Sequence, residues 1–140
     1  MRNSKSNLII CSTLLLAIVV ACSMSTANLS GLKVGKDKSV SSETSNFGPN
    51  DTVYAIGTVA NAPGAVKVKG LLAFEDVAGQ TPGPIPGLEK TLDLPGSGTA
   101  TFTFTPPPDG WPKGKYKIEV TLTDDSGAQK DQKAATFSVS

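Results

Sequence analysis

The sequence predicts an all-β domain in which two sheets pack face to face, and three observations lead to this expectation. Short segments alternate apolar and polar residues, turn residues separate them at intervals of roughly ten to fifteen residues, and no stretch keeps a helical period for three turns. The 14 glycines and 10 prolines are typical of a turn-rich chain. Because each segment has one apolar face, a second sheet is needed to cover it.

About seven strands are expected in this sandwich. The first is weakly patterned, the second is rather apolar on both faces, and the third and fourth are each apolar on one face. The fifth has the clearest alternation, with threonines between Ala100, Phe102 and Phe104, so both phenylalanines should point into the core. The last two alternate in the same way. In chain order, the expected strands are 32–40, 52–59, 65–75, 88–94, 99–105, 116–123 and 135–140.

Two connections carry strong turn or loop signals. Segment 80–87 has three prolines, which cannot donate to a sheet ladder, so we expect an exposed loop with a tendency to polyproline II. Its alternative role is docking in an aromatic groove of another protein. Segment 124–127, Asp-Asp-Ser-Gly, is expected to be a hairpin turn, because two adjacent carboxylates fall far short of a Ca²⁺ site.

The N-terminus has the order of a secretory signal. A basic stretch, 1–7, precedes an apolar run, 8–21, and a small polar tract begins at Cys22. As a helix the run would be about 21 Å long, short of the roughly 30 Å hydrocarbon core of a bilayer. We therefore expect 1–21 to be a processed targeting segment and not a transmembrane helix.

The end of this segment, Val19-Val20-Ala21-Cys22, resembles the lipobox of bacterial lipoproteins. The resemblance implies that Cys22 is alkylated by diacylglycerol, that the chain is cut before it, and that the new amine is acylated. Several acyl chains make a lasting anchor. The residue after the cysteine is Ser23 and not Asp, which in this family implies the outer membrane. The rival is a cut after Ala27 by ordinary signal peptidase, which would release a soluble protein.

If Cys22 is the first mature residue, 22–31 forms an acylated, flexible tether and 32–140 forms the folded domain. The other cysteine, Cys11, lies inside the apolar run. The mature domain therefore has no disulfide and must be held by burial alone.

Segment 106–120 reads PPPDGWPKGKYKIEV and resembles bacterial immunoglobulin-like envelope domains, in which a Pro-rich loop, an aromatic residue and Gly-x-Tyr precede the penultimate strand. The resemblance implies an immunoglobulin-like sandwich. Two features depart from antibody-type domains: the chain has no cysteine pair in this region, and Trp111 precedes the sixth expected strand. The resemblance therefore predicts the fold and not the function, because one fold can serve many functions.

The aromatic residues supply the candidate binding sites. Trp111 is expected to cap the end of the sandwich, and its alternative role is stacking on a sugar or a partner side chain. Tyr116 is expected to point inward, with its hydroxyl on loop backbone as in a tyrosine corner. A ligand-binding role would require Trp111 to share one exposed face with Tyr54 or Tyr116.

Composition excludes several function classes. The chain has no histidine, which removes Ser-His-Asp and Cys-His nucleophile pairs and His-containing zinc sites. The formal charge of +1 gives no electrostatic case for nucleic acid. The sequence also lacks a Gly-rich phosphate loop, so we expect no catalytic residue, no metal and no cofactor.

These observations predict a lipid-anchored cell-envelope protein that acts as a non-enzymatic interaction or structural module. Its anchor is the membrane and its further partner is an envelope protein or a glycan, with the outer membrane as the expected location. The alternative is a module that binds carbohydrate or another small ligand through Trp111 and nearby aromatic residues.

Overall fold

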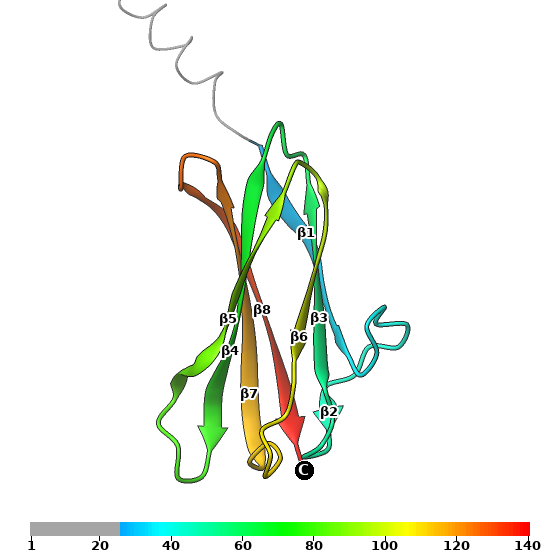
Figure 1. Ribbon diagram of the computed structural model, residues 1–140, viewed down its shortest axis with the longest axis vertical. Helices are drawn as coiled ribbons and strands as arrows, with labels where there is room; N and C mark the ends of the chain where they lie inside the picture. The colour runs from blue at the N-terminus through cyan, green and yellow to red at the C-terminus, as the bar shows by residue number, and fades with distance from the viewer. Residues whose placement is uncertain (1–25) are drawn as a thin grey trace, which may run out of the picture.

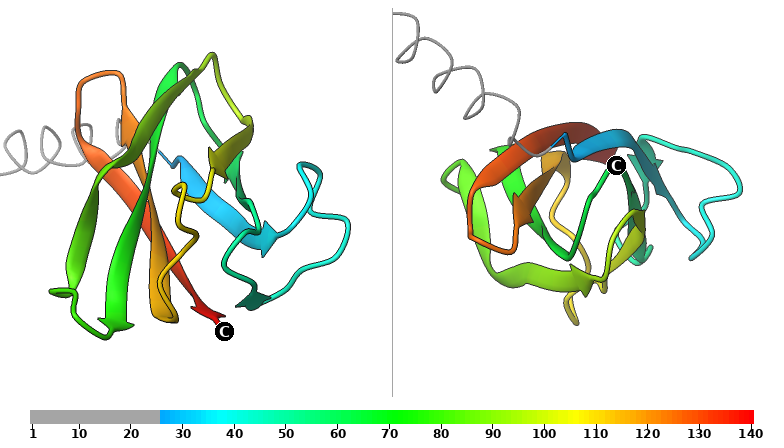
Figure 2. Two further views of the ribbon diagram at one scale, coloured as in Figure 1. Left: turned by 60° about the horizontal axis from the view of Figure 1, so that its bottom comes forward. Right: turned by 90° about the horizontal axis from the view of Figure 1, so that it is seen from above.

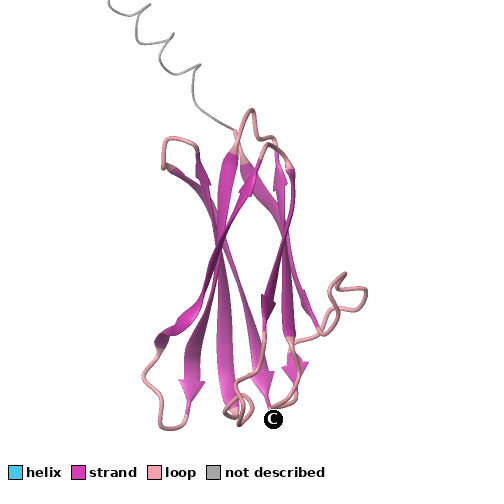
Figure 3. Ribbon diagram, in the orientation of Figure 1, coloured by secondary structure: helices cyan, strands magenta, loops and turns pink. Residues whose placement is uncertain are grey.

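The computed structural model describes residues 26–140, and this part of the chain is all-β (Figures 1 and 3). Eight strands form two sheets, which confirms the predicted two-sheet sandwich. None of the described residues forms a helix long and apolar enough to span a bilayer. The strands are β1 (Asn28–Gly35), β2 (Asn46–Phe47), β3 (Val53–Ala60), β4 (Val66–Val77), β5 (Gly83–Leu94), β6 (Gly98–Phe104), β7 (Gly114–Asp124) and β8 (Gln129–Val139).

One sheet has the order β1-β3-β6 and the other has the order β2-β8-β7-β4-β5. The short β2 runs parallel to β8, and all other neighbours are antiparallel. Where the two sheets meet at their margins, β1 lies against β8 and β5 lies toward β6, as the end-on view in Figure 2 shows. We call these margins the β1–β8 seam and the β5–β6 seam.

The core lies between the sheets and is entirely apolar among the buried residues described. Phe102 and Phe104 of β6 are 1% and 0% exposed, which confirms that both point inward. Opposite them, a Cβ atom on Gly70 of β4 would lie 2.7 Å from the Phe102 ring. Gly70 is therefore required by the close approach of this ring to the β4 backbone.

The first strand begins earlier than expected. Residues 28–31 belong to β1 and not to the expected tether 22–31, and the expected strand residues 36–40 lie in the loop after β1. Leu29 is 2% exposed and Ala27 is 5% exposed, so the core reaches beyond the expected domain boundary at 32. A β-bulge between Leu29 and Gly31 breaks the alternation, which hides this strand from a periodicity argument. Cys22 lies outside the described residues.

The expectation of a loop over 80–87 is wrong for its second half. Residues 83–87 open strand β5, with Pro84 paired opposite Ala73 of β4. Because β5 is the outermost strand of its sheet, it needs a ladder partner on one side only, and proline is tolerated there. The register shifts between Leu71 and Ala73 of β4, where residues 85–88 of β5 lie opposite Leu72 alone, so β5 carries the irregularity.

The turn expected at 124–127 joins β7 to β8 as a hairpin. One Asp124 carboxylate oxygen, Oδ1, accepts hydrogen bonds from the Ser126 hydroxyl at 2.6 Å and from the Ala128 N–H at 3.0 Å, and Gly127 supplies the positive φ of 88°. The Ser126 hydroxyl is the main cause that lowers the pKa of Asp124 from 3.8 to about 2. Within residues 26–140 no three acidic or other ligating side chains cluster as a metal site would require.

Candidate functional site

Trp111 is positioned by the connection between β6 and β7. A tight turn forms where the Gly110 N–H donates to the Pro107 carbonyl at 2.8 Å, and Gly110 takes a φ of 81°. A side chain on Gly110 would meet the Pro49 carbonyl at 3.0 Å, so the two connections touch closely. The Trp111 N–H then donates to the same Pro49 carbonyl at 2.7 Å. Contacts between two segments that are distant in the sequence therefore fix the backbone of Trp111, from which its side chain extends.

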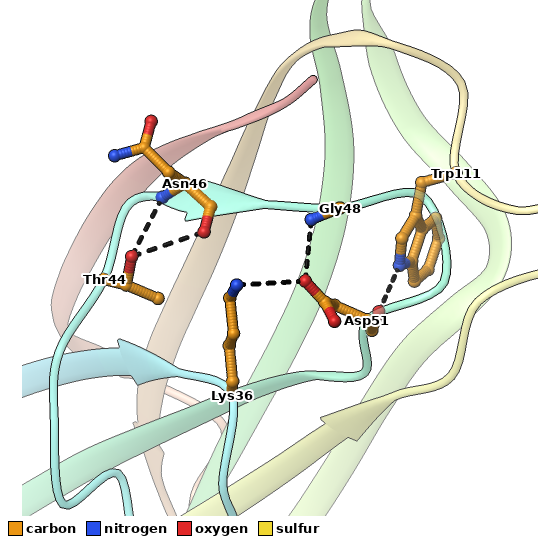
Figure 4. A network of polar contacts seen from close by, with 6 residues as sticks. All are labelled: Lys36, Thr44, Asn46, Gly48, Asp51 and Trp111. Atoms are coloured by element: carbon orange, nitrogen blue, oxygen red, sulfur yellow. Dashed lines mark hydrogen bonds and ion pairs between the residues drawn. The ribbon is translucent and has the colours of Figure 1, made fainter.

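The indole is held by the β2–β3 connection (Figure 4). Its Nε1–H donates to the Asp51 carbonyl at 2.8 Å, while the Asp51 carboxylate accepts the Gly48 N–H at 2.7 Å and pairs with Lys36 at 3.1 Å. The Gly48 N–H, followed by Lys36, lowers the pKa of Asp51 below its usual 3.8. Trp111 is 4% exposed and closes this end of the sandwich.

Tyr116 forms the expected tyrosine corner. Its ring is fully buried, and its hydroxyl donates to the Pro112 carbonyl at 2.6 Å. Burial raises the pKa of this phenol to about 12, so it stays protonated and keeps its donor. The contact fixes Pro112, which immediately follows Trp111 in the chain.

These rings belong to an aromatic cluster at one end of the molecule. Tyr116 stacks on Phe137 with centroids 5.2 Å apart, and Phe47 packs on Phe137 at 4.9 Å. Trp111 and Phe74 contact Tyr116 at 6.0 and 5.6 Å. The cluster thus joins the β6–β7 connection to the large sheet, and Phe74 is its partly exposed member.

The structure does not bring the three sequence-predicted aromatic residues onto one exposed face. Trp111 and Tyr116 contact each other but are both buried. Tyr54 is half-buried on β3, where its neighbours Val53 and Ala55 point into the core, so its ring faces outward from the small sheet. The geometry that the carbohydrate alternative requires is not present in these residues.

An apolar groove lies beside Trp111, at the β5–β6 seam. It has a volume of about 320 Å³ and is bounded by β4, β5 and the β6–β7 connection. Pro86, Pro107 and Pro112 are exposed along it, and one edge of the Trp111 indole reaches it. The groove is lined by Phe74, Ile85, Pro86, Leu88, Thr105, Pro107, Trp111 and Pro112.

Among these lining residues, sequence reasoning identified Trp111 as a candidate, and it included Ile85 and Pro86 in segment 80–87, whose alternative role was docking. The groove joins three segments far apart in the chain, and its β5 wall falls partly in the region we expected to be a loop. The available signal was the coincidence of two Pro-rich segments, 82–86 and 106–112, each beside large apolar residues.

Strands β5 and β6, which form this seam, carry one cation between them, Lys90. Lys90 of β5 reaches across to β6, where its Nζ donates to the Thr103 carbonyl at 2.8 Å. Thr105, two residues further on, lines the groove. Within the described part of the chain no acid pairs with Lys90, whereas Lys67 and Lys69 of the adjacent strand β4 pair with Asp93 and Glu89.

No family model matches the sequence, and no curated protein sequence matches it. Among solved structures, β-glucuronidase 2 of Bacteroides uniformis superposes with a TM-score of 0.53 at 17% identity. That match covers 80% of this chain and only 14% of the glucuronidase. A CARDB domain from Pyrococcus furiosus gives a TM-score of 0.44 at 15% identity, with 84% of this chain and 96% of that chain covered.

At this level of identity the likeness concerns the fold alone. Together with the two sheets and their order, it identifies the architecture. The chain contains an immunoglobulin-like β-sandwich domain.

Proposed function

We propose that the protein is a lipid-anchored cell-envelope protein whose sandwich domain is a non-enzymatic interaction module, with the apolar groove at the β5–β6 seam as its contact surface. The observation that carries this proposal is the groove itself. It gathers exposed prolines and partly exposed large apolar side chains in one place.

The walls of the groove are held rigidly before any partner binds. Trp111 is fixed by hydrogen bonds to the carbonyls of Pro49 and Asp51, and Pro112 is fixed by Tyr116. Proline side chains add little conformational freedom. A preformed apolar surface reduces the ordering cost of association, which favours a binding role.

The chemistry of the lining supports a non-enzymatic role. Apart from the Thr105 hydroxyl, the groove offers no acid, base or nucleophilic side chain. General acid–base and nucleophilic catalysis need such groups within reach of the substrate. Association is the role that an apolar lining of this kind serves.

The start of the folded domain supports processing at Cys22 and not after Ala27. Ala27 belongs to the core cluster, and the Thr26 hydroxyl donates to the Asn61 carbonyl at 3.3 Å. A cut after Ala27 would remove both residues from the folded domain. A cut before Cys22 keeps them and leaves three residues, 23–25, between the acylated cysteine and Thr26.

The position of the groove suits a module that is tethered through its N-terminus. The chain enters the sandwich at Asn28, which pairs with Ala60 at one end of β3, while Trp111 and Asp51 lie at the other end. Eight strand residues at about 3.3 Å each separate these ends by roughly 26 Å. The tether would therefore hold the groove away from the membrane.

The anchor is tested by Cys22→Ser, which removes the thiol that the lipobox presents. We expect the variant to lose incorporation of labelled palmitate and to leave the membrane fraction or accumulate as precursor. Cys11→Ser is the matched control and should keep both labelling and membrane association. Labelling that survives Cys22→Ser would contradict the anchor, and recovery with inner-membrane vesicles would contradict the outer-membrane location alone.

The contact surface is tested by placing a photo-crosslinking amino acid in the full-length protein in cells, at Pro86 or Pro107 of the groove. The matched control is Ser126, an equally exposed residue in the hairpin turn between β7 and β8. We expect discrete adducts from the two groove positions and none from the turn. Adducts of equal yield from all three positions, or none from the groove, would contradict the proposal.

A further inference from the structure

We infer that the groove binds an extended segment of a partner protein in which a large apolar side chain and a carboxylate lie two residues apart. This inference rests on the proposed function, since it specifies the partner of the same groove. Its two elements are the apolar lining and the Lys90 ammonium beside it.

Lys90 is held in place but its charge is not neutralised. Its Nζ donates one hydrogen bond to the Thr103 carbonyl, and an ammonium group has three donors, so two remain available. The acids on β5 are already used, because Asp93 and Glu89 pair with Lys67 and Lys69. Lys90 is therefore the unpaired cation that β5 and β6 present to an arriving partner, and it favours a carboxylate.

The spacing between the two elements sets the spacing in the partner. Leu88 and Lys90 are two residues apart on β5, so their side chains leave the strand on the same side about 6.6–7 Å apart. An extended peptide along β5 has the same repeat. An apolar side chain above Leu88 thus brings the residue two positions away to Lys90.

A protein segment fits this site better than the lipid surface that carries the anchor. The groove lies at the end of the sandwich opposite the entry of the chain at Asn28, roughly 26 Å away along β3. It is also flanked by β5 and β6, the outermost strands of their two sheets, which is where extended chains dock on β domains. A volume of about 320 Å³ accommodates one large side chain with part of its backbone.

The test uses short dye-labelled synthetic peptides and the full-length protein in the form that the cell produces, purified and placed in lipid nanodiscs. The probe peptide contains Trp-Ser-Glu, and its two controls contain Trp-Ser-Lys and Ala-Ser-Glu in the same flanking sequence. By fluorescence anisotropy we expect the probe to bind about fivefold more tightly than either control, as one exposed ion pair and one apolar anchor allow.

Lys90→Glu should reverse the preference, so that the Trp-Ser-Lys peptide binds better than Trp-Ser-Glu. Lys133→Glu on β8 makes the same charge change on an exposed lysine of the other seam and should leave the preference unchanged. Lys90→Met removes the charge and keeps the stem of the side chain, so it should abolish the preference even if Lys90→Glu does not fold. Thermal unfolding of each variant establishes that it is folded.

Equal binding of the Glu and Lys peptides to the wild-type protein, or a preference that Lys90→Glu and Lys90→Met leave intact, would overturn the inference. The proposed function fails separately, through loss of groove-specific crosslinking at Pro86 and Pro107. Crosslinking that persists without peptide preference would mean that the groove is a contact surface with a different chemistry.

Discussion

The two seams of the sandwich are closed by different means. At the β1–β8 seam the Leu29 N–H donates to the Asp131 carboxylate at 2.8 Å. Further along β8, the short strand β2 pairs with its outer edge. At the β5–β6 seam Lys90 makes the one cross-seam hydrogen bond seen between the described residues of these two strands, and the apolar groove lies beside it. The contact at the β1–β8 seam satisfies a backbone N–H, whereas the contact at the β5–β6 seam holds a side-chain ammonium. A pocket lies at each seam, and Leu32 and Ala135 line the one at the β1–β8 seam.

The two contacts differ because the backbone groups involved differ in their need for a hydrogen-bond partner from the protein. Leu29 sits at a bulge with its N–H partly buried, so the donor needs a protein acceptor and Asp131 supplies it. The Thr103 carbonyl lies on an edge strand where water is an alternative partner. The Asp131 contact therefore contributes to stability, while the Lys90 contact mainly positions a charge.

The largest expected effect concerns β6, which borders the β5–β6 seam and packs its inward face into the core. Phe102→Ala and Phe104→Ala should each lower the free energy of unfolding by about 3–5 kcal/mol, because each leaves a cavity in addition to the lost transfer energy. Thr101→Ala and Thr103→Ala, on the outward face, should cost under about 1 kcal/mol. Urea unfolding measures all four, and equal losses on both faces would show that β6 is buried on both sides.

A smaller effect is expected from overpacking beneath the same strand. Gly70→Ala would place a methyl group 2.7 Å from the Phe102 ring, so we expect a loss of about 1–3 kcal/mol. Gly98→Ala on β6 is the control, since a Cβ there meets no atom within 4 Å. If the two alanines had the same effect in urea unfolding, the Phe102 ring would not lie as closely on β4 as the structure has it.

The seams themselves are compared by removing their cross-strand side chains. Asp131→Ala should cost about 1–2 kcal/mol, because the Leu29 N–H loses its acceptor, and Asp131→Asn should recover part of this loss. Lys90→Ala should cost under about 0.5 kcal/mol. Thermal or urea unfolding gives both values. A Lys90 variant as unstable as the Asp131 variant would show that the cross-seam hydrogen bonds of the two seams contribute equally to stability.

The smallest expected effect is a dependence on acid pH that is concentrated in the connections between β1 and β3. Asp37 and Asp51, both between β1 and β3, have pKa values lowered from 3.8, chiefly by the Ser39 hydroxyl and the Gly48 N–H respectively. Their stabilisation is therefore present above about pH 4 and is lost as the pH falls through the lowered values.

Hydrogen exchange should show amides of β1 and β2 losing protection before those of β5 as the pH is lowered below 3.8. Asp37→Asn combined with Asp51→Asn should remove this difference between β1 and β2 on one side and β5 on the other. Asp124, whose pKa is lowered to about 2, serves as an internal reference at the hairpin turn. Simultaneous loss of protection in all strands would mean that acid acts on the whole fold and not on this region.

The sequence predicted the fold where alternation alone decides the outcome. Strand β6 and the hydrophobic half of β7 obey a period of two, so their inward residues were correctly assigned. The first half of β8 carries Gln, Lys and Asp on an exposed surface, so periodicity indicated only its last residues. The expected strand 88–94 is shorter than β5, because we took the prolines before it as evidence against a strand. Proline is excluded from a central strand but tolerated in an edge strand, and the sequence does not reveal which strand lies at the edge.

The candidate site was less accessible to sequence reasoning. Trp111 and Tyr116 were expected to be a cap and a corner, and their local motif places them there. The groove depends on how β5 lies relative to the β6–β7 connection, which is a property of the paired sheets. The role of Lys90 could not be predicted from the sequence. It depends on the hydrogen bond to the Thr103 carbonyl across the seam and on the pairing of the nearby acids with other lysines.

The aromatic cluster joins the connections to the large sheet through ring packing, and the only cysteines of the chain are Cys11 and Cys22. No redox chemistry is therefore needed to complete the domain of residues 26–140. We expect it to fold equally well under reducing and oxidising conditions, without a disulfide oxidoreductase and without a slow phase from thiol reshuffling. Its folding is thereby independent of the compartment in which the chain is released.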